Sequence, residues 1–339
     1  MVMSMRYVLG LLFVCVFAGV SDAQKTLKQT ENDLPKYYRP PVIENSAELQ
    51  NNLDAAVNEM LATFASKGFK KDEVAATLID MRDGERLKMA EFRGNERIYP
   101  ASVVKMFYLA MLERLIETAG VNLTPELTRG RRDMIVDSSN EATQYILDVI
   151  TGTSSGAELP ESEFKLWQYK RNRPNRYFAS MGYQNINVNQ KTFCEDAYGI
   201  EQQSRNYKGE NRNMLTTTAT ARLLAEIVLG RMGPAKSTKQ MMDLLKRDPF
   251  APSSDPDNQA NGFTGKALIT KKMTDARLWS KAGWTSKTRH DAAYIETADG
   301  LKFVLVVFTE NHANEKEPIP MIAGKVIDSL RILCQNRLR

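Results

Sequence analysis

Ser102 and Lys105 stand three residues apart in the run Pro100-Ala101-Ser102-Val103-Val104-Lys105. If a helix begins here, the spacing is close to one turn, so both side chains lie on the same face. A serine hydroxyl needs a nearby base to become a strong nucleophile, and a poorly solvated lysine can be that base when it is neutral. The pair therefore predicts attack of Ser102 on a carbonyl group. The alternative is a helix start that carries an ordinary surface lysine.

Ser138 and Asn140 form a second polar pair, directly after Met134-Ile135-Val136-Asp137. A hydroxyl that faces a cleft can relay a proton, and an amide beside it can hold a substrate carbonyl. Because Ser-Ser-Asn is also a common helix cap, a purely structural role is the alternative.

Lys281 and Gly283 form a third pair, on a candidate strand that is followed by Arg289. The two cations could bind a substrate carboxylate, and the glycine would let the substrate approach the strand closely. A solvated edge strand is the alternative.

In order and spacing, these three runs resemble the Ser-x-x-Lys, Ser-x-Asn and Lys-Thr-Gly motifs of class A β-lactamases and the related penicillin-binding proteins. The resemblance covers about residues 46–335, including the threonine-rich segment 213–224 and the stretch from Arg289 into 303–309. Agreement at three places in one order is far more specific than any single motif. It implies a serine hydrolase that works through an acyl-enzyme.

The resemblance implies a chemical role for three side chains. Ser102 would be acylated by a carbonyl substrate, and Lys105 would serve as the base or as part of the proton relay. Ser138 would pass a proton to the leaving nitrogen.

Other matching residues would bind the substrate. Asn140 would orient it, Lys281 would lie near the relay serine and the substrate carboxylate, and Arg289 would be a second anchor for that carboxylate. Gly283 belongs to the same motif as Lys281. The backbone amide of Trp284 would form an oxyanion hole with the amide of the nucleophile, where each donor contributes about 2.7–4 kcal/mol.

Three features depart from the family pattern. Ser139 replaces the usual aspartate of the second motif. Ala282 replaces the threonine or serine of the third and removes a hydroxyl, whose hydrogen bond to a charged group contributes roughly 1.5–3 kcal/mol. The family also carries a Glu-x-x-Leu-Asn loop whose glutamate activates the water that hydrolyses the acyl-enzyme, and no such sequence occurs between Pro160 and Asn213.

Glu195 is the candidate for the missing base. It occurs in about the right order, after the segment 174–182, which resembles the helix before that loop. Glu201 is a poorer candidate, and an ordinary surface acid is the alternative for Glu195. Without such a base the enzyme would be acylated and then stall, as penicillin-binding proteins do with β-lactams.

The run Gly152-Thr153-Ser154-Ser155-Gly156 fits the Gly-x-Ser-x-Gly pattern of another hydrolase class, which needs a strand before the serine and a helix after it. Here a predicted helix precedes the run and Glu158-Leu159-Pro160 follows it. We therefore interpret the run as a loop that ends a helix.

Apolar periodicity and turn residues predict the elements that hold these groups. We expect an α+β fold of the β-lactamase/transpeptidase type, with an antiparallel sheet flanked by the terminal helices (about 46–100 and 265–339) and a helical lobe (about 101–264). Residues 24–45 read as an extended linker, 251–262 as a loop and the basic run 168–176 as solvated surface. The predicted helices are 46–68, 103–118, 132–150, 217–229, 239–246 and 319–333, and the predicted strands are 74–81, 292–296 and 303–309, with hairpin turns at Asp83-Gly84 and Asp299-Gly300.

The N-terminus has the pattern of a secretory signal peptide. Arg6 precedes the apolar run 7–20, and the small residues Ser21-Asp22-Ala23 follow it. The run is too short for a comfortable membrane span, which needs about 20 apolar residues. We expect cleavage after Ala23 and a periplasmic or secreted mature chain of 316 residues (339 − 23) without a stable membrane anchor.

Composition excludes several classes of function. The chain is 42% apolar and 26% charged, as in soluble globular proteins, and its charge of +5 is spread along the sequence, so we expect no nucleic acid partner. Histidines are not clustered and no Cys-x-x-Cys occurs, so we expect neither a metal site nor a cofactor. Cys194 and Cys334 could form a disulfide or remain thiols, and we expect a monomer.

The leading functional hypothesis is a class A-like β-lactamase that hydrolyses a β-lactam through an acyl-enzyme on Ser102 and would confer antibiotic resistance. The alternatives are a D-Ala-D-Ala peptidase or esterase of the same superfamily, acting on cell-wall peptide or another acyl substrate, and a β-lactam sensor without turnover. The secreted single domain favours the first, whereas Ala282 and the missing loop motif favour the others.

Overall fold

The computed structural model describes residues 38–118, 120–193 and 196–337. In this part of the chain, a seven-stranded sheet has the order β1-β3-β2-β7-β6-β5-β4. Neighbouring strands are antiparallel, except that β1 and β3 are parallel. The strands are β1 (Val42–Asn45), β2 (Val74–Asp80), β3 (Arg86–Phe92), β4 (Lys246–Arg247), β5 (Arg277–Trp284), β6 (Thr288–Glu296) and β7 (Lys302–Glu310).

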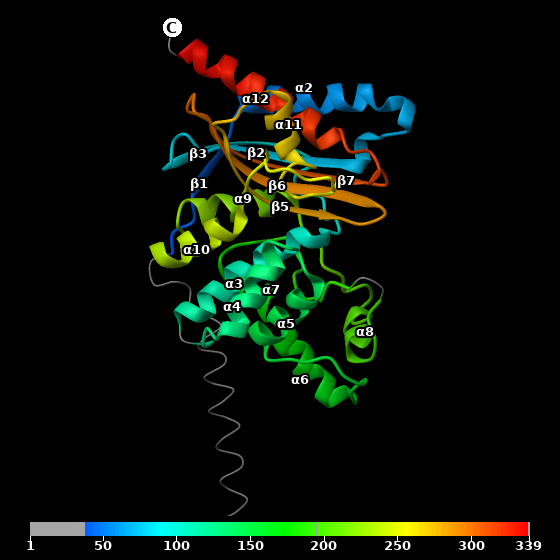
Figure 1. The fold of residues 1–339 in the computed structure, drawn as a ribbon. Helices are drawn as coiled ribbons and strands as arrows, with labels where there is room; N and C mark the ends of the chain where they lie inside the picture. Colours follow the sequence, from blue (N-terminus) through cyan, green and yellow to red (C-terminus); the bar gives the residue numbers. More distant parts are fainter. Residues whose placement is uncertain (1–37, 119, 194–195, 338–339) are drawn as a thin grey trace, which may run out of the picture.

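The described helices cover both faces of the sheet and build a separate lobe beside it (Figure 1). They are α2 (Ala47–Thr63), α3 (Lys105–Glu117), α4 (Pro125–Ile135), α5 (Asn140–Thr151), α6 (Glu161–Arg171), α7 (Arg173–Ser180), α8 (Ile200–Arg205), α9 (Thr217–Val228), α10 (Ala235–Leu245), α11 (Thr264–Thr270) and α12 (Pro318–Arg337), with short 3₁₀ turns η1 (Ala65–Lys67), η2 (Lys71–Glu73) and η3 (Ala101–Val104). In Figure 1, α2, α11 and α12 lie on one face of the sheet, α9 packs against the other, and α3 to α8 form the lobe.

The sheet separates two apolar cores. Along β2, Val74, Ala76 and Leu78 belong to the core shared with α2 and α12, whereas Ala75 and Ile79 belong to the core shared with α3 and α9. Side chains alternate between the faces of a strand, so a strand covered on both faces is apolar throughout. This is why β2 is apolar in the sequence apart from Thr77 and the terminal Asp80.

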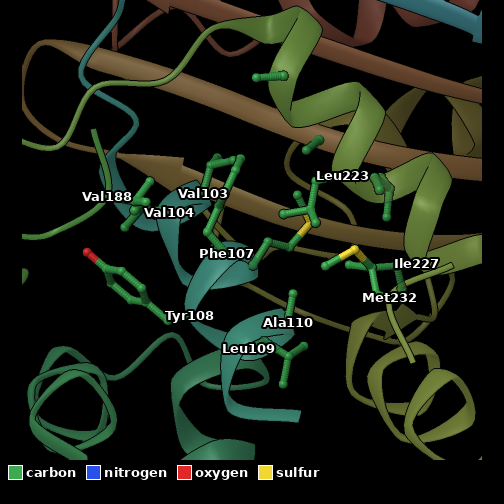
Figure 2. Packing of buried hydrophobic residues seen from close by; sticks show 14 of the residues in the cluster. Val103, Val104, Phe107, Tyr108, Leu109, Ala110, Val188, Leu223, Ile227 and Met232 are labelled. Atoms are coloured by element: carbon green, nitrogen blue, oxygen red, sulfur yellow. The ribbon is translucent and has the colours of Figure 1, made fainter. Parts of the chain in front are cut away.

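α3 joins the helical lobe to the sheet. Phe107 and Leu109 of α3 are fully buried, and the core around them includes Leu223 and Ile227 of α9 (Figure 2). Burying a side chain of this size contributes roughly 1.5–3 kcal/mol. The packing fixes the N-terminal end of α3, which directly follows the turn that contains Ser102.

The segment 132–150, predicted as one helix, is two helices. α4 ends at Ile135, and Ser138 has a φ of +58°, a left-handed conformation that an α-helix cannot contain. Ser139 then caps α5, because its Oγ accepts a hydrogen bond from the Ala142 backbone nitrogen at 3.0 Å. The break turns the second motif into a loop between two helices.

The predicted linker is partly a strand. Val42–Asn45 pairs with β3 and is therefore an edge of the sheet, and the Tyr38 hydroxyl donates to Glu226 of α9 at 2.9 Å. The remainder of that segment and the predicted signal peptide lie outside the described residues.

Two further predictions from the sequence were wrong. The basic run 168–176 is not solvated surface, because it lies in α6 and α7, where Gln168 is buried and Arg171 is fully buried. The predicted helical lobe, about 101–264, also included too many residues. β4 belongs to the sheet, and α9 packs directly against β2 and β7. The other predicted helices and strands are confirmed, with shifted ends; α10, for example, begins at Ala235.

Candidate active site

Ser102 lies in the η3 turn, one helical turn before Lys105. The side chain is half-buried, and the preceding Ala101 has a φ of +47°, which is an uncommon conformation for a residue with a Cβ. The end of β5 presses against this turn. A Cβ at Gly283 would lie 2.8 Å from the Ser102 backbone nitrogen and 2.9 Å from the Pro100 carbonyl oxygen, so only glycine fits there.

The Lys105 side chain is fully buried and reaches the second motif. Its Nζ donates to the Ser138 carbonyl oxygen at 2.5 Å, to Ser138 Oγ at 3.3 Å and to Asn140 Oδ1 at 2.9 Å. Asn140 is the first residue of α5, so the break between α4 and α5 supplies all three acceptors. The first two motifs are therefore in direct contact.

Lys281 approaches the same serine from the sheet. Its Nζ donates to Ser138 Oγ at 2.9 Å and to the Ala282 carbonyl oxygen at 2.8 Å, and it also donates to Gln259 Oε1. Ser138 Oγ therefore lies between the two lysines, and all three motifs meet in one cluster. The expected position of Lys281 near Ser138 agrees with this geometry.

Lys281 is surrounded by more basic than acidic side chains. Burial, followed by the positive charges of Lys105 and Arg247, holds the pKa of Lys281 well below its usual value. Asp291, opposite Ala282 on β6, opposes this effect and is itself buried, which raises the pKa of its carboxyl. Burial also lowers the pKa of Arg247 to about 10. Both lysine amines of the cluster are thus poorly solvated, and specific hydrogen-bond acceptors stabilise their charged forms.

Arg289 does not occupy the position expected of a carboxylate anchor. It is 1% exposed, and its guanidinium donates to Asp257 and, at 2.6 Å, to the Gly262 carbonyl oxygen. The guanidinium also lies over the Phe263 ring, 3.8 Å from its centroid. Asp257 in turn pairs with Lys316. Arg289 therefore holds the loop before α11 rather than an open binding position.

Trp284 ends β5, two residues before the hairpin turn. Its side chain is 38% exposed and leans on Phe263, with 5.8 Å between the ring centroids. Because Gly283 packs against the Ser102 turn, the strand brings the Trp284 backbone beside the nucleophile candidate. An aromatic ring at this edge gives an apolar surface next to the cluster.

Glu195 and Cys194 lie outside the described residues, so the choice between a Cys194–Cys334 disulfide and two thiols is untested. The chain that leads to them is held against α5, because Gln144 Nε2 donates to the Thr192 carbonyl oxygen at 3.2 Å. Glu201, the poorer candidate base, is buried in ion pairs with Arg171 and Lys191 and serves the structure of the lobe.

Two members of the cluster were missed in the sequence. Gln259 lies in a polar loop, where nothing in the local pattern distinguishes it from its neighbours, and its contact with Lys281 is made only by the fold. Asp291 did carry a signal, because it is an acid directly before the apolar residues 292–295 of β6. A charged residue on a strand that is buried on both faces needs a partner, and its backbone partner is the Thr264 nitrogen at 3.1 Å.

Other parts of the described chain offer less for catalysis. A hollow of about 600 Å³ between α6, α7 and the end of α8 is lined by Gln168, Asn172, Asn189 and Tyr207 and contains none of the motif residues. Within the described ranges, no group of three or more His, Cys, Asp and Glu side chains is placed to hold a metal ion. None of the described helices is long and apolar enough to cross a membrane.

Comparison with known proteins identifies the family and the fold. Residues 131–327 match the family described as the beta-lactamase enzyme family, whereas no curated protein sequence matches the chain. A β-lactamase from Sphaerobacter thermophilus superposes with a TM-score of 0.58 at 19% identity, covering 83% of this chain and 95% of that one. The protein PBP-A gives a TM-score of 0.58 at 15% identity (87% and 100% covered), and a β-lactamase from Xanthomonas campestris gives 0.56 at 17% (83% and 98%). These likenesses confirm the predicted α+β fold.

Proposed function

This chain belongs to the beta-lactamase enzyme family, and on that basis we propose that it is a serine hydrolase that transfers an acyl group from a β-lactam to Ser102. The observation that carries the proposal is the cluster in which Ser138 Oγ accepts hydrogen bonds from both Lys105 and Lys281. Lys105 lies one helical turn from Ser102, which supports Ser102 as the nucleophile, the buried Lys105 amine as its base and Ser138 as the proton relay.

In the proposed acylation, Lys105 in its neutral form takes the proton of Ser102 as Oγ attacks the carbonyl carbon. Asn140 Oδ1 and the Ser138 carbonyl oxygen orient the lysine amine. Ser138 then gives its hydroxyl proton to the leaving nitrogen, and it is restored by the proton that Lys105 has taken up. The acyl group ends on Ser102 Oγ and the amide bond is broken.

The backbone amides of Ser102 and Trp284 are the proposed donors to the oxyanion that forms in this step. The support is the close approach of the Gly283 backbone to the Ser102 turn, which leaves no room for a side chain. Donors held rigidly in this way stabilise charge that develops only in the transition state.

We propose Glu195 as the base for hydrolysis of the acyl-enzyme. Asn140 and Gln144 lie four residues apart on α5 and therefore on one face of it. Asn140 contacts Lys105 and Gln144 holds the backbone of Thr192, so the chain passes the cluster about one helical turn from Asn140. Glu195 follows three residues later.

A stable acyl-enzyme without turnover is the second candidate function. The likeness to PBP-A covers all of that chain, and an L158E mutant of PBP-A is described as an acyl-enzyme complex with penicillin G. A β-lactam would then acylate Ser102 in the same way, but water would not release it. The two functions share the first chemical step and differ in the second.

The test is the purified mature chain with a chromogenic β-lactam, followed by turnover and by intact mass. We expect turnover, or a mass increase equal to the β-lactam, and the loss of both in Ser102→Ala. Ser286→Ala, an exposed serine on the β5–β6 hairpin, is the matched control and should behave as wild type. Sustained turnover supports a β-lactamase and a stable adduct supports the second candidate. Neither signal, or an adduct that persists in Ser102→Ala, would refute the proposal.

We also propose that the chain is exported, on the strength of Arg6, the apolar run 7–20 and the small residues before Gln24. Expression of the whole chain in a bacterium followed by fractionation should give a periplasmic or secreted protein that begins at Gln24. A full-length chain in the cytoplasm would refute export.

A further inference from the structure

Gln259 connects the loop 248–263 to two catalytic motifs. Its Oε1 accepts a hydrogen bond from Lys281 Nζ, and its Nε2 donates to the Val136 carbonyl oxygen at 2.9 Å and to that of Ile135 at 3.5 Å. Both ends of the amide are thus used, one on β5 and one on the chain that leads into Ser138. A surface glutamine would instead direct its amide into solvent.

The loop that carries Gln259 is held on both sides of it. Arg289 donates to Asp257, to the Pro256 carbonyl oxygen at 3.4 Å and to the Gly262 carbonyl oxygen at 2.6 Å. The arginine comes from β6, next to the strand of Lys281. A buried guanidinium with several acceptors fixes backbone more firmly than a single hydrogen bond does. Gln259 is therefore presented to Lys281 by a rigid support.

Lys281 needs such an acceptor. Its amine is fully buried, and the charged groups that face it are Lys105 from the start of α3, Arg247 from β4 and Asp291 from β6. Arg247 is a cation, and Lys105 becomes one when it takes up the proton of Ser102. An ammonium group has three N–H donors, and here they meet Ser138 Oγ, the Ala282 carbonyl oxygen and Gln259 Oε1. Gln259 is the one acceptor of these three that lies outside the motifs.

We propose that Gln259 is a positioning residue, which keeps Lys281 protonated and directed at Ser138 during acyl transfer. The inference rests on the proposed function, since it assigns the relay to Ser138.

The chemical consequence concerns the proton of Ser138. A hydroxyl oxygen has two lone pairs and one O–H donor. Lys105 and Lys281 both donate to Ser138 Oγ, at 3.3 Å and 2.9 Å, and so occupy the lone pairs. The O–H bond must then point away from both lysines, free to serve a leaving nitrogen. If Lys281 loses its proton or turns away, this orientation is lost.

The first test measures the rate at which a β-lactam acylates Ser102, by intact mass, as a function of pH. Gln259→Leu should slow acylation about tenfold or more. It should also lower the pH at which acylation is lost on the alkaline side by about one unit, because the Lys281 ammonium loses an acceptor. Gln259→Glu should raise that alkaline limit, because a carboxylate favours the charged form of Lys281. Asn261→Asp is the matched control: it adds an acid to the same loop and should shift the profile little, because the native Asn261 side chain makes an exposed hydrogen bond with the Ala251 carbonyl oxygen rather than with Lys281.

A merely structural role would lower stability without moving the two profiles in opposite directions. Equal profiles in wild type, Gln259→Leu and Gln259→Glu would overturn the proposal, as would a shift of Asn261→Asp equal to that of Gln259→Glu.

The second test does not need activity. In ¹³C-lysine-labelled protein, the Lys281 signal is assigned by its loss in Lys281→Arg, and its titration is followed in wild type and in both Gln259 variants. We expect the Lys281 pKa to fall in Gln259→Leu and to rise in Gln259→Glu, and an unchanged titration refutes the inference. If wild type shows neither turnover nor an adduct, the proposed function fails and this titration still decides the role of Gln259.

Discussion

At the scale of single residues, the cluster uses two lysines in different ways. Lys105 contacts Asn140 and the Ser138 backbone, which fixes its amine toward the start of α5. Lys281 contacts Ser138 Oγ and Gln259 and lies among other cations. Two like charges on one hydroxyl are costly, so the loss of one proton is made easier by the presence of the other. The proposed acylation assigns the neutral form to Lys105, whereas Lys281 has Gln259 as an additional acceptor for its ammonium protons.

Glu195→Gln should separate the two steps of the reaction. If Glu195 activates the water, acylation of Ser102 continues at nearly the wild-type rate, whereas hydrolysis of the acyl-enzyme slows at least about 100-fold, the usual contribution of a general base. Rapid-quench intact mass measures both steps. The control is Glu210→Gln, an exposed acid between α8 and α9, which should leave both rates unchanged. Wild-type turnover in Glu195→Gln would exclude this residue as the base.

His290 gives the pH dependence of stability a predictable component. It is fully buried, accepts from the Thr309 nitrogen at 3.1 Å through Nδ1 and so donates through Nε2 to the Tyr99 carbonyl oxygen at 2.9 Å. Burial lowers its pKa to about 4, from the ordinary 6.5 of the unfolded chain. Unfolding therefore takes up a proton between these values, and the stabilisation is complete above pH 6.5 and lost as the pH falls toward 4, about 3 kcal/mol in all.

His290→Gln tests this component. Urea denaturation from pH 7.5 to pH 4 should show a flatter decline in the free energy of unfolding than in wild type, over that window. Other buried acids, such as Glu226 and Asp291, contribute equally to both proteins and cancel in the comparison. Parallel curves for the two proteins would contradict the assignment.

At the scale of elements, the contact between β5 and η3 sets the geometry of Ser102, the proposed nucleophile. Gly283→Ala would insert a carbon 2.8 Å from the Ser102 nitrogen and 3.0 Å from that of Val103, so the turn must move. A displacement of about 1 Å near reacting atoms costs roughly 100-fold in rate. We expect acylation of Ser102, followed by intact mass, to slow by this order. Gly84→Ala, with its nearest atom at 4.0 Å, is the control, and equal rates in the two variants would show that the contact is unimportant.

A buried ion cluster joins α5, α6, α8 and the chain before Thr192. Arg171 donates to Glu201 at 2.6 and 2.8 Å and to Asp148 at 3.0 Å, and Lys191 donates to Asp148 at 2.6 Å. Removing one partner of a buried pair leaves an uncompensated charge, which costs about 3–5 kcal/mol. Arg171→Met should lower the free energy of unfolding by this amount in urea denaturation. The double variant Arg171→Met/Glu201→Gln should recover part of it, and strict additivity would argue against a coupled cluster.

These elements show how far sequence can predict the molecule. The three motifs meet as their order predicted. Short motifs can be found from neighbouring residues alone, and the strands and helices around them have clear periodicity. The buried Arg171 was missed because a basic helix resembles a solvated one until its acidic partners, 23 and 30 residues away in the sequence, are brought beside it. Gln259 and the displaced Arg289 depend likewise on where a loop without periodicity is fixed.

At the scale of the whole molecule, the site lies where the lobes meet. Ser102 lies in η3, and Lys105 begins α3, the helix that joins both lobes. Ser138 comes from the helical lobe and Lys281 from the sheet. A relative movement of the lobes would therefore separate the two lysines that share Ser138. The stability of their junction is a condition for the chemistry, and α9, packed between the sheet and α3, is its central element.

The N-terminal segment strengthens this junction. Glu226 of α9 is fully buried and accepts from Tyr38 at 2.9 Å, Tyr183 at 3.0 Å and Arg222 at 2.8 Å. Burial raises the pKa of the Glu226 carboxyl despite these donors. Tyr38 therefore clamps the start of the described chain onto α9 and supplies part of the solvation that the carboxylate lacks.

Tyr38→Phe should cost about 1–3 kcal/mol in the free energy of unfolding at pH 8, because a buried carboxylate loses a donor. The hydrogen bond favours the charged form, so its removal raises the folded-state pKa of Glu226 further, and the deficit should shrink as the pH falls and Glu226 takes up a proton. Urea denaturation at pH 8 and pH 5 measures this difference, with the exposed Tyr198→Phe as the control. A deficit that is equal at both pH values would mean that Tyr38 stabilises the junction by packing alone, and that Glu226 does not depend on it for its charge.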